Sequence, residues 1–346
     1  MDIITQNYPA KYWHFLPNGR IQCDLCPQHC KLLDGQRGIC FGRKRLGDRL
    51  FLMTFGSSSG FCMDPVEKKP LNHFFPGSPI LSFGTAGCNL SCKFCQNWDI
   101  SKARDDNALA DCASPKAIAE KAIALGAKSV AFTYNEPIIF MEYAVETAKE
   151  CHKLNIKTVA VTNGYICDEP RKEFFGFMDA ANVDLKGFSE KFYKDITGAT
   201  LKPVLDTLYY LRHETNVWLE ITTLLITGLN DSDKELEDEI DWIVNNLGLD
   251  VPLHFTAFYP AWKMAHHPPT PVETLIRARN MAIRKGLRYV YTGNVYHPEG
   301  SNTYCNNCKK IIVSREGYQI TNYHLTEQGA CKFCGAKCAG VFDKGN

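Results

Sequence analysis

The sequence lacks several features that would assign it to a class at once. No apolar run approaches the roughly 18 residues of a membrane-spanning helix, and residues 1–20 lack the charged-then-apolar pattern of a signal peptide. Charge of one sign is also missing, because 39 Lys and Arg nearly cancel 38 Asp and Glu and leave a net charge of +1. Membrane proteins, exported proteins and dedicated nucleic-acid-binding proteins are therefore disfavoured, and we expect a cytoplasmic protein.

Cysteine, by contrast, is abundant. The chain has 16 cysteines among 346 residues, below the roughly 8–10% of small disulfide scaffolds but many for an ordinary enzyme. In a reducing cytosol, cysteines at short spacings indicate metal or cluster ligands. Most fall in three groups, which divide the chain into an N-terminal cysteine-rich cap (1–75), a central region (76–300) and a C-terminal module (301–346).

The central region alternates between strand-like and helix-like patterns. Strands are expected at 79–85, 129–134, 156–162, 179–185, 217–225 and 251–259, with a seventh candidate at 288–291. Helices are expected at 115–125, 137–154, 190–212, 232–246 and 272–285. This alternation predicts an α/β fold of repeated βαβ units with a parallel sheet. The strands are too few for a full eight-stranded barrel, so we expect a partial barrel or an open sheet, with ligands at the carboxyl ends of the strands.

Cys88, Cys92 and Cys95 directly follow the first of these strands, at the catalytic end of the expected sheet. The spacing C-x3-C-x2-C can hold three corners of a [4Fe–4S] cluster, which four thiolates ordinarily bind. The missing fourth ligand leaves one iron open to a substrate or cofactor, as in an open metal site. The alternative is a zinc site completed by Asn97 or Asp99.

Polar residues also end several later strands. Candidates for a site are Asn135, Glu136, Asn163, Asp184 and Lys186. A carboxylate at Glu136 suits a bound cation, although an acidic residue also favours the start of a helix. For Asn163 the alternative is an ordinary turn, and for Asp184 and Lys186 it is a buried ion pair. Glu220 and Thr222 share one face of their strand, where polar satisfaction of the core is an equal explanation, whereas a lone strand histidine such as His254 is usually a satisfied core residue.

The segment 84–95, with Phe94 before its last cysteine, resembles the radical S-adenosylmethionine (SAM) superfamily. The resemblance implies a partial (β/α)6 TIM-like barrel in which SAM chelates the fourth iron. One electron, supplied by a flavodoxin- or ferredoxin-like donor, would then split SAM into methionine and a 5′-deoxyadenosyl radical that abstracts hydrogen from a substrate. It also implies that Phe94 lies by the adenine and that Asn135, Glu136, Asn163, Asp184 and Lys186 help to seat SAM.

Narrower resemblances concern the substrate. Segments 133–137, 162–164 and 184–186 resemble glycyl-radical activases, typified by pyruvate formate-lyase activating enzyme, although Val161 stands where activases commonly carry Asp and Tyr259 where His often follows the aromatic residue. The flanks resemble the radical SAM component of the AmmeMemoRadiSam system, on the segments 23–40, 64–70, 84–101 and 291–295. This implies AMMECR-type and Memo-type proteins as partners.

These features lead to three hypotheses about the function. The first is a radical SAM enzyme that acts on a small molecule or a partner protein. The second is an activase that acts on a protein glycine. The third, from another class, is a non-catalytic iron–sulfur electron-transfer or metal-binding protein, which predicts a fully ligated cluster.

The C-terminal cysteines form two C-x2-C pairs separated by 22 residues: Cys305, Cys308, Cys331 and Cys334. This approximates zinc-ribbon spacing, in which four thiolates close a structural Zn²⁺ site and Cys338 is a spare or competing ligand. Residues 302–346 hold six basic and three acidic residues, a net charge of +3, so nucleic-acid binding is not expected.

The N-terminal group consists of Cys23, Cys26, Cys30 and Cys40, spaced C-x2-C-x3-C-x9-C. This spacing leaves zinc, an auxiliary [4Fe–4S] cluster and free thiols open, because neighbouring iron–sulfur chemistry favours a cluster while ferredoxin-like spacing is missing.

Overall fold

The computed structural model describes residues 7–103, 109 and 111–342, and its centre is one mixed sheet of eight strands in the order β16-β15-β14-β13-β12-β11-β9-β8. Seven of the strands are parallel: β9 (Pro79–Phe83), β11 (Ser129–Phe132), β12 (Lys157–Thr162), β13 (Ala180–Asp184), β14 (Trp218–Leu225), β15 (Leu253–Ala257) and β16 (Val290–Gly293). Strand order follows chain order, as repeated βαβ units require. The expected α/β architecture with a parallel sheet is confirmed, including the seventh strand.

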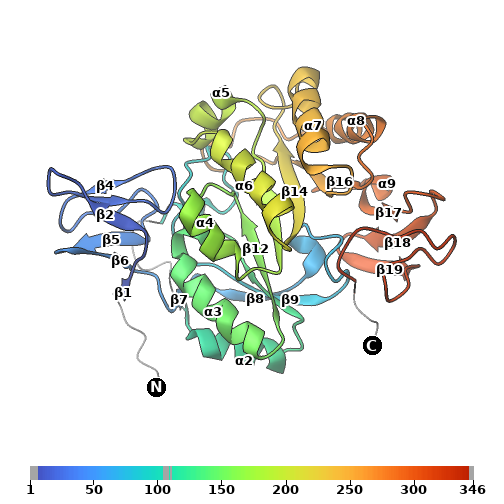
Figure 1. The fold of residues 1–346 in the computed structure, drawn as a ribbon. Helices are drawn as coiled ribbons and strands as arrows, with labels where there is room; N and C mark the ends of the chain where they lie inside the picture. The colour runs from blue at the N-terminus through green and yellow to red at the C-terminus, as the bar shows by residue number, and fades with distance from the viewer. Residues whose placement is uncertain (1–6, 104–108, 110, 343–346) are drawn as a thin grey trace.

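Helices cover the outer face of this sheet (Figure 1). They are α2 (Pro115–Ala124), α3 (Met141–Lys153), α4 (Asp168–Phe175), α6 (Lys202–Glu214), α7 (Asp233–Leu247) and α8 (Val272–Arg284). Serine caps start two of them, since Ser114 Oγ accepts from the backbone N–H of Ala117 and Ser232 Oγ from that of Glu235. The strands are buried almost throughout because helices pack on one side and the barrel interior lies on the other.

The helix expected at 190–212 is interrupted. It consists of α5 (Glu190–Phe192), a π-helical turn at Tyr193–Thr197 and then α6. The break falls at Gly198, whose φ of 70° is left-handed and whose Cα packs against Ser91 of the cysteine loop. The helical period continues across the break, so the pattern alone suggested one helix.

The N-terminal region forms a separate small module of hairpins (Figure 1). Its strands are β1 (Tyr8–Pro9), β2 (Trp13–Phe15), β3 (Ile21–Cys23), β4 (Lys31–Leu32), β5 (Arg43–Leu46) and β6 (Arg49–Leu52), in the two sheets β1-β6-β5 and β2-β3-β4. β8 (Phe61–Pro65) also lies within the expected cap of 1–75, yet it pairs antiparallel with β9 as an edge of the central sheet.

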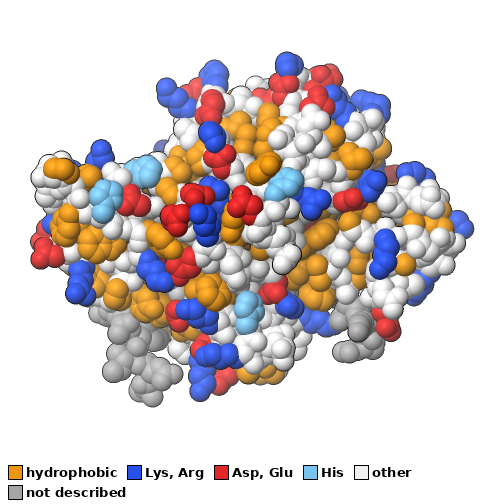
Figure 2. Space-filling model, viewed as in Figure 1, with side chains coloured by type: hydrophobic (Ala, Val, Ile, Leu, Met, Phe, Trp, Pro, Cys, Tyr) orange, Lys and Arg blue, Asp and Glu red, His pale blue; other side chains and the backbone are white. Residues whose placement is uncertain are grey.

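The C-terminal module packs on the opposite side of the barrel from the N-terminal module (Figure 1). It contains α9 (Pro298–Ser301) and the sheet β17 (Thr303–Tyr304), β18 (Ile311–Glu316) and β19 (Gln319–Tyr323). Acidic and basic side chains are interspersed over the face shown in Figure 2, in line with the small net charge. Within the described residues, no helix is both long and apolar enough to cross a membrane.

Candidate active site

A cavity of about 1160 Å³ opens at the carboxyl ends of the parallel strands. Cys88, Cys92 and Cys95 lie in its lining, together with residues that follow β11, β12 and β13 and with residues of the C-terminal module. Cavities for a single ligand commonly measure about 300–1,000 Å³. At about 1160 Å³ this cavity lies just above that range.

The loop that carries the three cysteines is fixed by close backbone approach. A methyl group at Gly84 would lie 2.4 Å from the Thr133 carbonyl oxygen, so only glycine fits there. The Asn135 side chain ties the loop to the end of β11: its Oδ1 accepts from Thr85 N at 3.0 Å, and its Nδ2 donates to Gly87 O at 3.0 Å. Asn135 was expected to contact SAM, and these bonds give it a role in holding the cysteine loop as well.

Glu136 lies at the centre of the predicted SAM side. Its carboxylate is buried and accepts hydrogen bonds from Thr162 Oγ1 at 2.6 Å, Asn163 N at 2.8 Å and Ile138 N at 3.1 Å. Burial raises the pKa of Glu136 to about 7, although the bonds from Thr162 and Asn163 oppose the shift. The Asn163 side chain in turn donates to Asn89 Oδ1 at 2.8 Å, next to Cys88.

Asp184 and Lys186 form an ion pair at the end of β13, with Lys186 Nζ 2.7 Å from Asp184 Oδ2. Burial acts to lower the pKa of Lys186, but the Asp184 carboxylate and the Cys92 thiol outweigh it and raise the pKa. Both side chains line the cavity, as does Phe94, which is buried with its ring centre 6.2 Å from that of Phe192. Thus all the residues predicted to seat SAM lie around one cavity with the three cysteines, and their individual roles stay predictions.

Another charged group at the same cavity was not predicted from the sequence. Lys69 Nζ lies 2.6 Å from Asp64 Oδ2, and both side chains are 3% exposed. Tyr134 OH donates to the same carboxylate oxygen at 2.9 Å, and Lys69 lies 4.6 Å from the centre of the Tyr134 ring. Lys69 and Tyr134 line the cavity. In the sequence, the segment 64–70 stands out only by its resemblance to a family. The feature that could have indicated a site is its group of charged residues next to an apolar strand.

The far end of the cavity is also polar. His254 Nε2 lies 2.7 Å from Glu220 Oε2, and Glu220 also accepts from the backbone N–H groups of Asn72 and His73. Glu220 is thus a satisfied core carboxylate below the cavity, whereas Thr222 and His254 reach its lining. Among the atoms that the structure describes, Thr222 Oγ1 is buried there without a hydrogen-bond partner.

Comparison with known proteins places this site in a family. The sequence profile described as the Radical SAM superfamily matches residues 83–243. An uncharacterized protein of Methanocaldococcus jannaschii is 38% identical over 329 residues, which covers 95% of this chain and 98% of that protein. The chain belongs to the radical SAM superfamily. Membership implies a [4Fe–4S] cluster and SAM as cofactors.

Other relatives share part of the chain or only its fold. The 4-hydroxyphenylacetate decarboxylase activating enzyme of Clostridioides difficile is 27% identical over 164 residues, 45% of this chain and 52% of that enzyme. The crystal structure of a radical SAM methyltransferase from Sphaerobacter thermophilus aligns with a TM-score of 0.53 at 13% identity, over 89% of this chain and 81% of that one. The second likeness shows the radical SAM fold, so the expected partial barrel is confirmed.

The donor set fits the cluster that radical SAM membership implies. A single zinc ion with Zn–S bonds of about 2.3 Å needs ligand sulfurs that converge on one point. Among the described residues, the side chains whose potential ligand atoms all lie within 4.8 Å of one another, in a group of three or more, are the four cysteines of the C-terminal module. Cys88, Cys92 and Cys95 do not form such a group. Asn97, the proposed extra zinc ligand, instead donates through Nδ2 to Tyr134 O at 2.7 Å. Three thiols that do not converge on one point are compatible with a cluster that gives each thiolate its own iron.

The C-terminal cysteines have the opposite geometry. Their four sulfurs lie within 4.8 Å of one another, with Cys305 Sγ 3.6 Å from Cys334 Sγ and Cys308 Sγ 3.8 Å from Cys331 Sγ. This arrangement fits a zinc-ribbon-like module. Cys338 lies outside the group, with its sulfur 3.8 Å from His73 Nδ1, so it is not a competing ligand in this arrangement.

The C-terminal module also forms one wall of the radical SAM cavity. Residues of β18, β19 and the turn between them line it, and Arg315 is the buried cation of this wall. Its guanidinium donates to Asn72 O at 2.8 Å and to Thr303 Oγ1 at 2.9 Å. This role of Arg315 could not be predicted from the sequence, because the spacing of the cysteines does not determine how the hairpin of β18 and β19 is oriented relative to the barrel.

Proposed function

We propose that the protein cleaves SAM reductively and uses the resulting radical to abstract a hydrogen atom from a small polar molecule held in the same cavity. The bound and reduced cluster supplies the electron that splits SAM into methionine and a 5′-deoxyadenosyl radical. The observation that carries the proposal is the cavity itself, whose lining holds the three cysteines, further polar side chains and residues of the C-terminal module.

On the side of the cysteines, the residues are suited to an amino acid and a nucleoside. The buried carboxylate of Glu136 complements the ammonium group of SAM, and its pKa of about 7 leaves it charged at slightly alkaline pH. Lys186 presents a cation for a carboxylate while Asp184 keeps it in place at 2.7 Å. Phe94 offers a buried aromatic edge for the adenine.

The other polar side chains of the lining are suited to a substrate with hydrogen-bonding groups. Lys69, Tyr134, Thr222 and His254 line the same cavity. A site built from buried polar groups discriminates strongly against molecules that leave those groups unpaired. Residues of β18, β19 and the turn between them also line the cavity, which favours a small molecule that fits inside it over a folded protein.

The test is the formation of 5′-deoxyadenosine by anaerobically reconstituted protein with SAM and dithionite. We expect cleavage by the wild type and by the matched control Cys112→Ser, an exposed cysteine outside the site. Cys92→Ala should abolish it, and full cleavage by that variant would overturn the proposal. Deuterium transfer from labelled candidate substrates into 5′-deoxyadenosine then identifies the substrate.

A second candidate function is activation of a glycyl-radical enzyme. It is favoured by the similarity to the 4-hydroxyphenylacetate decarboxylase activating enzyme, which spans 164 residues and includes about half of that relative. It predicts a stable glycyl radical on a partner protein, seen by electron paramagnetic resonance (EPR). If no candidate partner shows this signal while labelled small molecules transfer deuterium, the small-molecule function stands.

The remaining partners and the metal are proposals as well. The reaction needs a low-potential donor, for which a flavodoxin- or ferredoxin-like protein is suited, and the resemblance of the flanks supports AMMECR-type and Memo-type proteins as associates. Co-purification of tagged full-length proteins tests the latter. For the C-terminal module we propose Zn²⁺, since the four converging thiols match its preferred tetrahedral ligation.

A further inference from the structure

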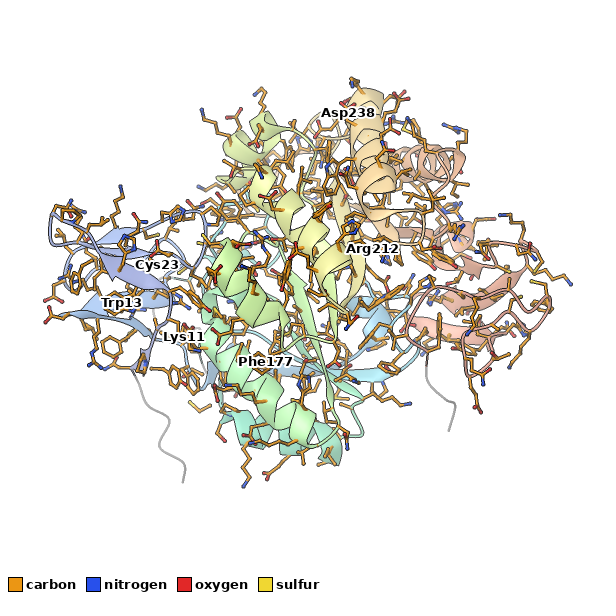
Figure 3. The ribbon with its side chains drawn as sticks, viewed as in Figure 1. Lys11, Trp13, Cys23, Phe177, Arg212 and Asp238 are labelled. Carbon is orange, nitrogen blue, oxygen red and sulfur yellow. The ribbon has the colours of Figure 1, made fainter. Side chains whose placement is uncertain are left out.

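The four N-terminal cysteines form a buried group beside the barrel. Cys23 ends β3, and Figure 3 labels it within the N-terminal module. Cys23, Cys26 and Cys40 are buried, Cys30 is partly buried, and all four are free thiols. Backbone bonds bring them together, because Cys23 N donates to Cys30 O at 2.9 Å and His29 N donates to Cys26 O at 3.1 Å.

Local contacts show that these sulfurs share one space. A methyl group at Gly38 would lie 3.6 Å from Cys30 Sγ and 3.7 Å from Cys40 Sγ, so Gly38 lies against both thiols. Ile39 N donates to Cys30 Sγ at 3.5 Å. The same kind of N–H···S bond occurs at the other two cysteine groups, from Leu90 N to Cys88 Sγ and from Phe333 N to Cys331 Sγ, both at 3.4 Å. Hydrogen bonds of this kind stabilise metal-bound thiolates and tune them.

The spacing of the sulfurs distinguishes between metals. In the part of the chain that the structure describes, no three of the N-terminal sulfurs all lie within 4.8 Å of one another, whereas the four C-terminal sulfurs do. One tetrahedral zinc ion holds its sulfurs roughly 3.8 Å apart, given Zn–S bonds of about 2.3 Å. A [4Fe–4S] cluster carries each thiolate on a separate iron and does not need sulfurs that converge on one point, and neither the N-terminal group nor Cys88, Cys92 and Cys95 converges in that way.

The N-terminal group also lies directly behind the loop that holds the catalytic cysteines. A methyl group at Gly87 would lie only 1.9 Å from Cys40 O, so the backbones of Cys40 and Gly87 touch, one residue before Cys88. On the other side of Cys88, Gln28 Nε2 donates to Asn89 O at 2.9 Å. The two groups of thiols are thus joined by direct contacts on both sides of Cys88.

We propose that Cys23, Cys26, Cys30 and Cys40 bind a second [4Fe–4S] cluster that passes electrons one at a time to the cluster at Cys88, Cys92 and Cys95. A flavodoxin- or ferredoxin-like donor is oxidised by one electron, the second cluster is reduced and then reoxidised, and the catalytic cluster is reduced by that electron. The site with four protein thiolates has no open iron, so it relays electrons and does not bind SAM. The relay rests on the proposed function, while the presence of the second cluster does not.

The first experiment keeps the N-terminal module intact. The full-length variant Cys88→Ala/Cys92→Ala/Cys95→Ala is reconstituted anaerobically with iron and sulfide, and its metals and EPR spectrum are measured. We expect about four irons per chain in one cluster, with a reduced signal that SAM does not change. More than the one zinc ion proposed for the C-terminal cysteines, or no iron at all, would overturn the second cluster. Because this variant cannot cleave SAM in any case, the result does not depend on the proposed function.

The second experiment tests the relay. Cys26→Ser/Cys30→Ser is compared with Cys112→Ser for SAM cleavage driven either by dithionite or by a reduced flavodoxin. We expect the double variant to keep its dithionite-driven rate within about twofold and to lose at least about tenfold with flavodoxin. An equal loss with both reductants, or no loss with either, would overturn the relay. Loss of cleavage by every protein, including Cys112→Ser, would instead contradict the proposed function.

Discussion

The two modules that flank the barrel are both attached to it through a buried ion pair, but the two pairs differ in geometry. Each uses a buried Arg–Glu pair. Arg43 of β5 donates through Nη2 to both oxygens of Glu142 in α3, at 2.8 and 2.6 Å. Arg315 of β18 faces Glu67 at 3.5 Å, and among the described atoms Arg315 Nε and Glu67 Oε2 are buried without hydrogen-bond partners. Arg43 Nε is likewise buried without a partner among the described atoms, so the two attachments differ in the pair itself, whose charged atoms lie 2.6 Å apart at the N-terminal module and 3.5 Å apart at the C-terminal one.

The same contrast holds for their thiols. The C-terminal sulfurs converge as for one ion, and their module contributes a wall to the cavity. The N-terminal sulfurs do not converge in this way, and their module contacts the catalytic loop through Cys40 and Gln28. The C-terminal module thus contributes to the cavity lining, while the N-terminal module contacts the loop that carries Cys88.

The largest expected effect is loss of the C-terminal metal. Structural zinc in small finger peptides contributes about 10–16 kcal/mol, so Cys331→Ala should release one zinc per chain and unfold the module. Metal analysis and limited proteolysis measure both effects. Cys338→Ala is the matched control, because it removes a buried cysteine of the same module that lies outside the group. Retention of zinc by Cys331→Ala would show that this cysteine is not a ligand of a structural zinc ion in the C-terminal module.

Two glycines beside cysteines come next. Gly87→Ala places a methyl group 1.9 Å from Cys40 O at a φ of +95°, so we expect the unfolding free energy to fall by about 3 kcal/mol or more. Gly335→Ala has a φ of +76° but open space, so it should cost only the left-handed penalty of about 1–2 kcal/mol. Denaturation of the two apo variants under the same conditions compares them. Equal losses of unfolding free energy in the two variants would show that the contact between Cys40 and Gly87 does not constrain the catalytic loop.

The anchoring pairs should differ in the same direction. Glu142→Gln leaves the buried Arg43 charge without its carboxylate and should cost about 3–5 kcal/mol. Glu67→Gln removes a 3.5 Å contact from an Arg315 that keeps its bonds to Asn72 and Thr303, and should cost about 1 kcal/mol or less. Thermal unfolding measures both. A greater loss for Glu67→Gln would reverse the assignment of the tighter anchor.

The smallest effect concerns pH. Burial raises the pKa of Glu67 above its ordinary value, although Arg315 opposes the shift. A carboxyl group with a raised pKa in the folded state binds a proton more tightly there than when unfolded, so its stabilising contribution is complete below the unfolded pKa of about 4.5 and is lost as pH rises through the folded pKa. Glu67→Gln should flatten stability over that range. An unchanged dependence of stability on pH would show that Glu67 does not contribute to it.

Much of the barrel was predictable from the sequence because its signals are local. Buried strands followed by capped helices gave the parallel sheet, and a three-cysteine loop after the first strand indicated the end that carries the site. The interruption at Gly198 was missed because one left-handed residue ends a helix without disturbing the apolar period on either side.

The rest of the site depends on contacts across the chain. Lys69 reaches the cavity because β8 joins the sheet antiparallel, and Arg315 reaches it because the C-terminal hairpin folds back over the barrel. Neither contact leaves a periodic trace in the sequence. The cysteine spacings likewise could not separate zinc from a cluster in the N-terminal group, since the distances between sulfurs are set by the tertiary fold.

The most direct test of the central claim is the EPR spectrum of the reduced, anaerobically reconstituted wild-type protein with and without SAM. We expect SAM to change the signal of the cluster at Cys88, Cys92 and Cys95, because three thiolates leave one iron open to it. The Cys88→Ala/Cys92→Ala/Cys95→Ala variant should show no such change. A wild-type spectrum that SAM leaves unaltered would contradict the account and favour a fully ligated electron-transfer protein.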